Sequence, residues 1–408
     1  SHSATAIIDD DFVIFNDVVS AQNINIDGFD EAQLSANINA VDTIYTNDTA
    51  LRLMANVDIT ANQIDIDDVN SVNNANLIIN AGESLRTTGI NLGNGNLSIH
   101  LDGSASTVGQ VDITGNIIAN TVIIDAQNST ITTLNDQLVI GGTIDGTNVQ
   151  INDFSTVAIN GDITLLGDLD IVGLDASIGA DITANEITYN SQDASELLIT
   201  ANSIIEVNEY TNDVGIRGTA DLELNLLNPS GAVNIDNIIL TDSDLTLNVQ
   251  NVVVVSVDTL GADSILITNN DTADLTVGGI TDESTLNIDG FNDVTFTDNV
   301  LLASLDVNAN DNITQTGGTS IEITDGILDL NAGGSIFVTQ IESGNLNDNT
   351  VILIAGLDVV DVNDTQQDFI VDNANVLNIS AIGNVPVFES SFDSVTPDPV
   401  VPDPVVPV

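Results

Sequence analysis

Short runs of aliphatic residues alternate with polar residues along nearly the whole chain. In residues 57–67, VDITANQIDID, the apolar side chains of Val57, Ile59 and Ala61 fall on one face of an extended segment. Alternation with a period of two is typical of a β-strand that buries one face. The polar pair at 62–63 interrupts the alternation before the apolar positions resume. The pattern therefore predicts two short strands joined by a corner.

Similar phrases recur throughout the sequence without matching one another. The recurrences are VDITGNIIANTVIID at 111–125, GDITLLGDLDI at 161–171, ADITANEITYN at 180–190 and LITANSIIEVN at 198–208. Degenerate self-similarity of this kind marks a repeat architecture, in which each unit buries its apolar face by stacking on its neighbours. The spacings favour coils of about 20 residues.

Turn-forming residues separate these runs, and helical spacing of apolar residues is hard to find. Glycine pairs at 141–142, 317–318 and 333–334 fall between predicted strands. Glycine, asparagine and aspartate tolerate the backbone conformations that a sharp corner needs. The aliphatic content and an aromatic share of only 3% favour thin repeated layers over a globular core. The sequence predicts an all-β fold, a parallel β-helix (β-solenoid) rod.

The charge balance is strongly acidic. The chain of 408 residues has 61 acidic residues against three arginines, Arg52, Arg86 and Arg217, and its formal net charge is -58. Without basic clusters it lacks the means to bind a phosphate backbone or to insert at an anionic membrane. Self-repulsion of this size requires screening or bound cations. We expect Arg86 and Arg217 to pair with nearby carboxylates.

The amino-acid composition and the repeat pattern divide the chain into three parts. Residues 1–20 are predicted to form an N-terminal cap or assembly strand, and residues 21–385 to form the solenoid. Six of the seven prolines lie at or beyond Pro386, so residues 386–408 are predicted to be an extended tail rich in Pro and Val. This tail is either a linker or a segment that docks on a neighbouring subunit.

Aspartate pairs at predicted corners are candidate calcium ligands. Asp27 and Asp30 lie in NINIDGFDE, and Asp289 and Asp293 lie in LNIDGFND. Carboxylate and carbonyl oxygens are the ligands that calcium prefers, although the twelfth position of an EF-hand loop would fall on Leu34 instead of glutamate. At each position, the simpler interpretation is an aspartate that lies in a turn and is exposed to solvent. Calcium is nevertheless the cofactor that this composition favours.

Residues 304–341, SLDVNANDNITQTGGTSIEITDGILDLNAGGSIFVTQI, resemble the repeats of large secreted bacterial exoproteins of the filamentous haemagglutinin and autotransporter-passenger type. The similar repeat pattern covers most of residues 20–385. The resemblance implies a right-handed parallel β-helix that is displayed at, or released from, the outer surface of a bacterium with two membranes. It also implies a role as an adhesin or a filament.

Enzymatic chemistry is the weakest interpretation of the sequence. Parallel β-helices include polysaccharide lyases and hydrolases, but here the three arginines are scattered. His100 and Asp102 share the polar face of a predicted strand, and no nucleophile motif accompanies them, so a surface histidine is expected. With 61 acidic residues, paired carboxylates for a hydrolase are easy to propose and carry little weight. We predict a protein without enzymatic activity.

The favoured function is a structural subunit of an extracellular bacterial fibre, filament or biofilm matrix. Open solenoid ends present unpaired strands, which favours homopolymers formed end to end by strand addition. The residues predicted to mediate assembly are Ile7, Ile8, Phe12, Ile14, Phe15, Val400, Val401, Val405 and Val406. Two alternatives remain open: an adhesin stalk that binds glycans or surfaces, and a polysaccharide-active β-helix enzyme.

Overall fold

The computed structural model describes most of the chain between residues 6 and 383. The described residues are 6–8, 11–102, 109–126, 136–191, 197–212, 216–226, 233–240, 243–249, 254–260, 264–269, 274–278, 280–281, 285–324, 326–343, 350–361, 369–371, 376–381 and 383. Every helix or strand element among them is a β-strand, as predicted. The chain forms two compact units, Ser1–Asp274 and Leu275–Val408.

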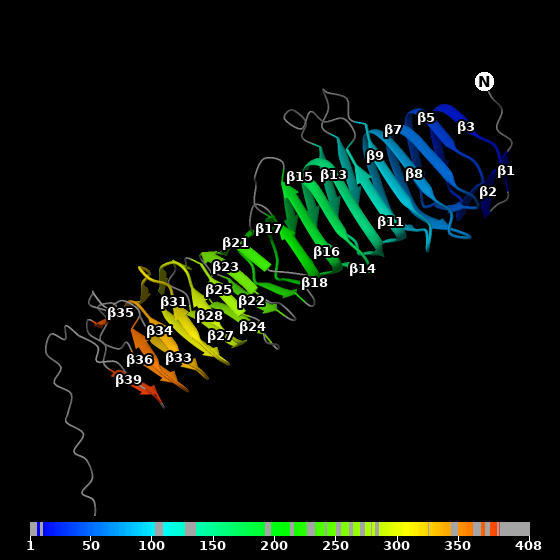
Figure 1. The fold of residues 1–408 in the computed structure, drawn as a ribbon. Helices are drawn as coiled ribbons and strands as arrows, with labels where there is room; N and C mark the ends of the chain where they lie inside the picture. Colours follow the sequence, from blue (N-terminus) through cyan, green and yellow to red (C-terminus); the bar gives the residue numbers. More distant parts are fainter. Residues whose placement is uncertain are drawn as a thin grey trace, which may run out of the picture. The chain divides into compact units, whose positions relative to one another are not determined.

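The first unit is a ladder of strands that run parallel to one another after an antiparallel start (Figure 1). Its strands are β1 Ala6–Ile8, β2 Phe12–Phe15, β3 Val19–Asp27, β4 Glu31–Leu34, β5 Ile38–Asn47, β6 Ala50–Leu53, β7 Val57–Ser71, β8 Leu77–Asn91, β9 Leu97–Leu101, β10 Gln110–Ile113, β11 Ile117–Asp125, β12 Gln137–Ile140, β13 Ile144–Ile159, β14 Ile163–Leu165, β15 Leu169–Ile178, β16 Ile182–Ser191, β17 Leu197–Ile199, β18 Ser203–Asn212, β19 Ile216–Gly218, β20 Leu222–Leu226, β21 Val233–Leu240, β22 Asp244–Val249, β23 Val254–Leu260 and β24 Ser264–Asn269.

Each coil of the first unit contributes to three faces, which the chain visits in turn. One aliphatic residue per coil marks each face: Val13, Ala32, Leu51 and Val69 on the first, Ile38, Ile59, Ile79 and Ile99 on the second, and Ile24, Ile44, Ile64 and Leu85 on the third. The coil length varies. The coil that leads from Leu51 to its partner Val69 is clearly shorter than the one that leads from Ile117 to its partner Ile144.

The core is a stack of these aliphatic columns. All twelve residues are at most 8% exposed. Burying one such side chain contributes about 1.5–3 kcal/mol, and stacking the coils in register removes both faces of each layer from water. The polar positions between them face outward, so the alternation in residues 57–67 is confirmed. The expected corner is confirmed too, because the pairing of β7 with β8 shifts register between Ala61 and Gln63.

A column of glycines allows the coils to approach closely at one corner. A Cβ atom added at Gly142 would lie 2.1 Å from the carbonyl oxygen of Gly115, and one added at Gly161 would lie 2.1 Å from that of Gly142. Atoms that are not bonded to each other do not approach so closely, so these positions have no room for a side chain. The corner between β12 and β13 therefore requires glycine.

The second unit repeats the three-faced coil. Its strands are β25 Asp274–Val277, β26 Ile280–Thr281, β27 Thr285–Phe291, β28 Val294–Phe296, β29 Val300–Leu302, β30 Ser304–Ala309, β31 Ile313–Gln315, β32 Ile321–Ile323, β33 Ile327–Ala332, β34 Ile336–Val338, β35 Ile341–Ser343, β36 Thr350–Ala355, β37 Val359–Asp361, β38 Phe369–Val371 and β39 Val376–Ala381. One face consists of β26, β29, β32, β35 and β38. The second face contains β27 and its parallel partner β30, and the third contains β28 and its parallel partner β31.

A buried glutamine connects two coils of the second unit. Gln315 is 1% exposed, and its Nε2 donates to the carbonyl oxygens of Thr319 at 2.7 Å and Gln340 at 2.8 Å. Its Oε1 accepts from the backbone N–H groups of Thr339 at 2.9 Å and Gln340 at 3.2 Å. Both donors and both lone pairs of the amide are thus satisfied, as a buried polar side chain requires.

The predicted architecture is confirmed in its main features, an all-β chain of parallel coils. Within residues 1–20, predicted to be a cap or assembly strand, β2 pairs in parallel with β4. Among the strand pairings of the described residues, that of β1 with β2 is the antiparallel one. The tail at 386–408 lies outside the described residues.

Candidate functional site

Asparagine and aspartate side chains at the corners bind the backbone of the next coil. Asn56 Oδ1 accepts from the backbone N–H of Asn76 at 2.9 Å, and Asn76 Oδ1 accepts from that of Asn96 at 2.9 Å. In the second unit Asp293 Oδ1 accepts from the backbone N–H of Asn312 at 2.9 Å. Each bond satisfies a donor at a corner, where the ladder between strands is interrupted. Part of the Asn and Asp punctuation is therefore structural.

The four predicted calcium ligands lie on the surface or in these corners. Asp27 and Asp30 are exposed, and Asp27 Oδ1 accepts from Asn47 Nδ2 at 3.1 Å. Asp289 is exposed on β27, whereas Asp293 Oδ1 is bound by the backbone and side-chain N–H groups of Asn312. Among the residues that the structure describes, no group of three or more His, Asp or Glu side chains is placed to hold a metal ion. Calcium binding stays a prediction of the sequence.

Two aspartates lie in register on neighbouring coils of the second unit, Asp306 on β30 and Asp329 on β33. Burial raises the pKa of Asp329, and the charge of Asp306 raises it further. Burial also raises the pKa of Asp306, with a smaller contribution from the charge of Asp289. In the described part of the chain, Asp329 Oδ1 is the one buried side-chain polar atom that lacks a hydrogen-bond partner. The ionised pair therefore destabilises this unit.

Asp329→Asn should raise the melting temperature of the second unit by a few degrees at about pH 7. The folded-state pKa lies above the unfolded one, so the carboxylate costs stability at high pH, and the cost disappears as the pH falls through the folded pKa toward about 4. The gain from the substitution should shrink over the same window. An amide suits this position, because Asn331 Nδ2 donates to Asn308 Oδ1 at 3.2 Å between the same two strands.

Thermal unfolding followed by circular dichroism at several pH values measures this effect. Asp298→Asn is the matched control, since Asp298 is exposed at a corner and its Oδ1 accepts from the backbone N–H of Asn299, a bond that an amide oxygen preserves. An equal, pH-independent gain in both variants would show that total charge, and not the stacked pair, sets the effect.

His100 lies in β9, half-buried on the outward side, as expected for a surface histidine. In register with it on the next coil is Asp125. Burial raises the pKa of Asp125, the charge of Asp153 raises it further, and His100 opposes both effects. The arrangement places a histidine beside a carboxylate on the outer surface.

The N-terminal end of the first unit has one covered face and a free strand edge. Phe12, Ile14 and Phe15 belong to β2, which is already paired on both sides, with β1 and with β4. Ile7 and Ile8 belong to β1, the outermost strand. By contrast, β3 pairs with β5 and with no other strand among the described residues. Among the described residues, β3 therefore has a free edge, and so does β1 on the side away from β2. Val400, Val401, Val405 and Val406 lie outside the described residues.

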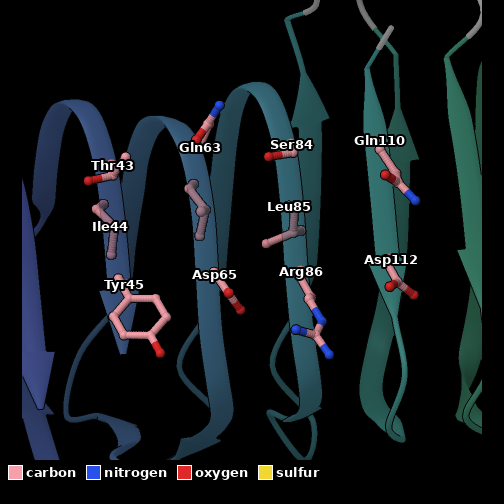
Figure 2. Close-up of a pocket in the computed structure, with 11 residues that line it drawn as sticks. Thr43, Ile44, Tyr45, Gln63, Asp65, Ser84, Leu85, Arg86, Gln110 and Asp112 are labelled. Atoms are coloured by element: carbon pink, nitrogen blue, oxygen red, sulfur yellow. The ribbon is translucent and has the colours of Figure 1, made fainter. Parts of the chain in front are cut away.

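A groove crosses four coils on the outer surface of the third face, and its volume is about 500 Å³ (Figure 2). Strands β5, β7, β8 and β10 each supply two outward residues to it. One row contains Thr43, Gln63, Ser84 and Gln110, and the other contains Tyr45, Asp65, Arg86 and Asp112. Each residue is the register partner of the next in its row. The groove is thus a product of stacking, not of a loop.

The arginines behave differently from one another. Arg52 Nη1 lies 3.3 Å from Glu31 Oε2, an ion pair between neighbouring coils. Arg86 is the register partner of Asp65 and Asp112, but none of the described carboxylates lies within 4.0 Å of its guanidinium nitrogens. The expected pairing of Arg86 with a described carboxylate is therefore wrong.

Reasoning from the sequence did not find this groove. The signal was present as spacing, because Tyr45, Asp65 and Arg86 follow one another at nearly equal intervals, each close to the length of one coil in this part of the chain. The corner shifts that set the register were needed to place them in one row.

Comparisons of the chain with protein-family models, curated proteins and solved structures found no match. The resemblance to filamentous haemagglutinin-type exoproteins stays a prediction that rests on the repeat pattern. In the described part of the chain, no helix has the length and apolar character of a membrane span.

Proposed function

We propose that the protein is a non-enzymatic structural subunit of an extracellular bacterial fibre, filament or matrix, and that its copies join end to end. The observation that carries the proposal is the free edge of β3. Its backbone N–H and C=O groups on the side away from β5 have no strand partner among the described residues. In the second unit, β39 pairs with β36 alone in the described part.

Free strand edges of this kind template the addition of another strand. The antiparallel pairing of β1 with β2 supports the proposal, because β1 is an extra strand added to the edge of the first parallel coil. Main-chain hydrogen bonds would supply the affinity, and the outward side chains would supply the specificity. The partner is a second copy of this chain.

An extracellular setting suits the charge. A net charge of -58 is tolerated where salt or divalent cations screen the repulsion between the acidic side chains. Calcium is the cation that we propose for this role. The second candidate, an adhesin stalk, is favoured by one observation, the groove on the third face.

Proline at position 20 tests assembly through β3. Val19 N donates to Asn37 O at 3.1 Å, toward β5, so the N–H of the next residue, Ser20, points to the free edge. Ser20→Pro removes that donor and leaves the bonds to β5 in place. We expect the critical concentration for assembly to rise about tenfold, and Ser20→Ala to leave it unchanged.

Light scattering and electron microscopy over a concentration series, with calcium or with a chelator, measure the assembly, and circular dichroism verifies that both variants are folded. Wild-type protein that stays monomeric at every concentration in both media would refute end-to-end assembly. Unchanged assembly of a folded Ser20→Pro variant would exclude the β3 edge.

A further inference from the structure

The groove on the third face presents a row of side chains that the fold itself does not use. Tyr45, Asp65, Arg86 and Asp112 point outward from four successive coils (Figure 2). Successive members are separated by one strand spacing, about 4.8 Å. The row therefore runs along the stacking direction, and an elongated ligand could contact all four residues at once.

Tyr45 supplies an exposed aromatic ring at one end of the groove. Aromatic residues make up only 3% of the chain, and the largest ones in the core, such as Tyr189 and Phe154, are at most 1% exposed. Tyr45 is 41% exposed. Its hydroxyl donates to Asn47 Oδ1 at 3.4 Å, which helps to orient the ring. An oriented, exposed ring is a platform for stacking on a flat, partly apolar surface.

The polar members of the groove supply donors and acceptors in alternation. Asp65 and Asp112 accept hydrogen bonds, and Arg86 between them donates up to five. Two residues of the neighbouring row are held in place: Gln63 Nε2 donates to Glu83 at 2.9 Å, and Thr43 Oγ1 donates to Asn23 Oδ1 at 2.8 Å. These bonds leave the side-chain oxygens of Gln63 and Thr43 available to a ligand.

Charge decides which class of ligand fits. Two carboxylates and one guanidinium leave the row with an excess negative charge, and the whole chain carries -58. An anionic ligand is repelled by this field. A ligand with many hydroxyl groups meets both needs, because each hydroxyl donates to a carboxylate and accepts from the guanidinium. The apolar faces of sugar rings also stack on aromatic side chains.

We propose that this groove binds a neutral, unbranched polysaccharide, with consecutive sugar rings lying across consecutive coils. One ring stacks on Tyr45, and the following rings place their hydroxyls against Asp65, Arg86 and Asp112. The proposal does not depend on end-to-end assembly, since all four residues belong to one copy of the chain.

Binding of short oligosaccharides tests the proposal. The probes are oligosaccharides of cellulose, chitin and mannan, with oligogalacturonate as the anionic comparison. Calorimetry measures affinity, and saturation-transfer NMR detects contact between ligand protons and the protein. At least one neutral probe should bind saturably, and the anionic probe should bind about tenfold more weakly or not at all. Affinity should increase with the number of sugar rings until the four coils are spanned.

Two variants assign the site. Tyr45→Ala and Arg86→Gln should each weaken binding of the neutral probe by about tenfold or more. Arg52→Gln is the matched control, because Arg52 lies outside the groove in an ion pair with Glu31, and it should leave binding unchanged. Thermal unfolding verifies that all three variants are folded. The proposal fails if no neutral probe binds, if oligogalacturonate binds best, or if folded Tyr45→Ala and Arg86→Gln variants retain full affinity.

Discussion

Gly142→Ala should destabilise the first unit by about 3 kcal/mol or more, while Gly141→Ala should leave its stability nearly unchanged. A Cβ atom at position 142 would lie 2.1 Å from the carbonyl oxygen and 2.2 Å from the carbonyl carbon of Gly115. Both are backbone atoms of the preceding coil, so relief requires the coils to separate. Separation lengthens the ladder hydrogen bonds on either side of the corner.

Gly141 is the control because it is the neighbouring residue at the same corner. A Cβ atom there would meet nothing closer than 3.6 Å, which is an ordinary van der Waals contact. Both substitutions reduce the freedom of the unfolded chain equally, so the difference between them isolates the steric clash. Denaturant unfolding followed by circular dichroism measures both free energies. Equal stabilities would show that the coils can move apart at this corner at little cost.

Gln315→Glu should destabilise the second unit by about 3 kcal/mol at neutral pH. The substitution keeps the shape of the side chain and replaces the donor Nε2 with a carboxylate oxygen. That oxygen would face the carbonyl oxygens of Thr319 and Gln340, which now accept from Nε2 at 2.7 and 2.8 Å. A buried charge would thus be added where two acceptors already point. Protonation restores one donor, so the loss should diminish in acid.

Gln137→Glu makes the same chemical change at an exposed position. The register partners of Gln137 are Gln110 and Thr156, so no carboxylate neighbours it in its row. Its effect should stay within about 0.5 kcal/mol, as for most surface substitutions. Urea unfolding at neutral and acidic pH compares the two variants. A loss of similar size in both would mean that added negative charge, and not the buried amide, accounts for the result.

The sequence predicted the elements of the fold well because a coil of this kind uses local information. The alternation of Val57, Ile59 and Ala61 specifies a buried face for one strand, and the polar pair at 62–63 specifies the corner. Glycine pairs between aliphatic runs marked further corners, among them the one at 141–142 between β12 and β13. Because every coil repeats this logic, the all-β class and the parallel stacking followed from the pattern.

Contacts between coils could not be predicted from the local pattern. Asparagine and aspartate read as surface residues, yet the side-chain oxygen of Asn76 accepts from the backbone of Asn96 in the next coil. Gln315 reads as one more polar residue in a strand, yet it is buried with all four hydrogen bonds made inside the protein. Both roles depend on which residue of another coil lies opposite.

At the candidate sites, too, the sequence predicted the face on which a residue lies but not its neighbour on the next coil. His100 is half-buried on the outward side of β9, where alternation placed it. The residue in register with it on the next coil is Asp125, a neighbour that alternation within one strand does not indicate. The row that joins Tyr45, Asp65 and Arg86 was not predicted at all. A shift of one residue in register would move each of these side chains to a different neighbour.

The sequence by itself determined the period-two burial of each strand, the positions of many corners and the acidic, lysine-free surface. Those features depend on the chemistry of residues that lie within a few positions of one another. The tertiary structure decided the register between coils, because the coils differ in length and bulges at the corners shift the pairing. Register in turn places Asp306 against Asp329 and creates the groove. Stacking, which no single coil specifies, is what turns the repeated pattern into particular sites.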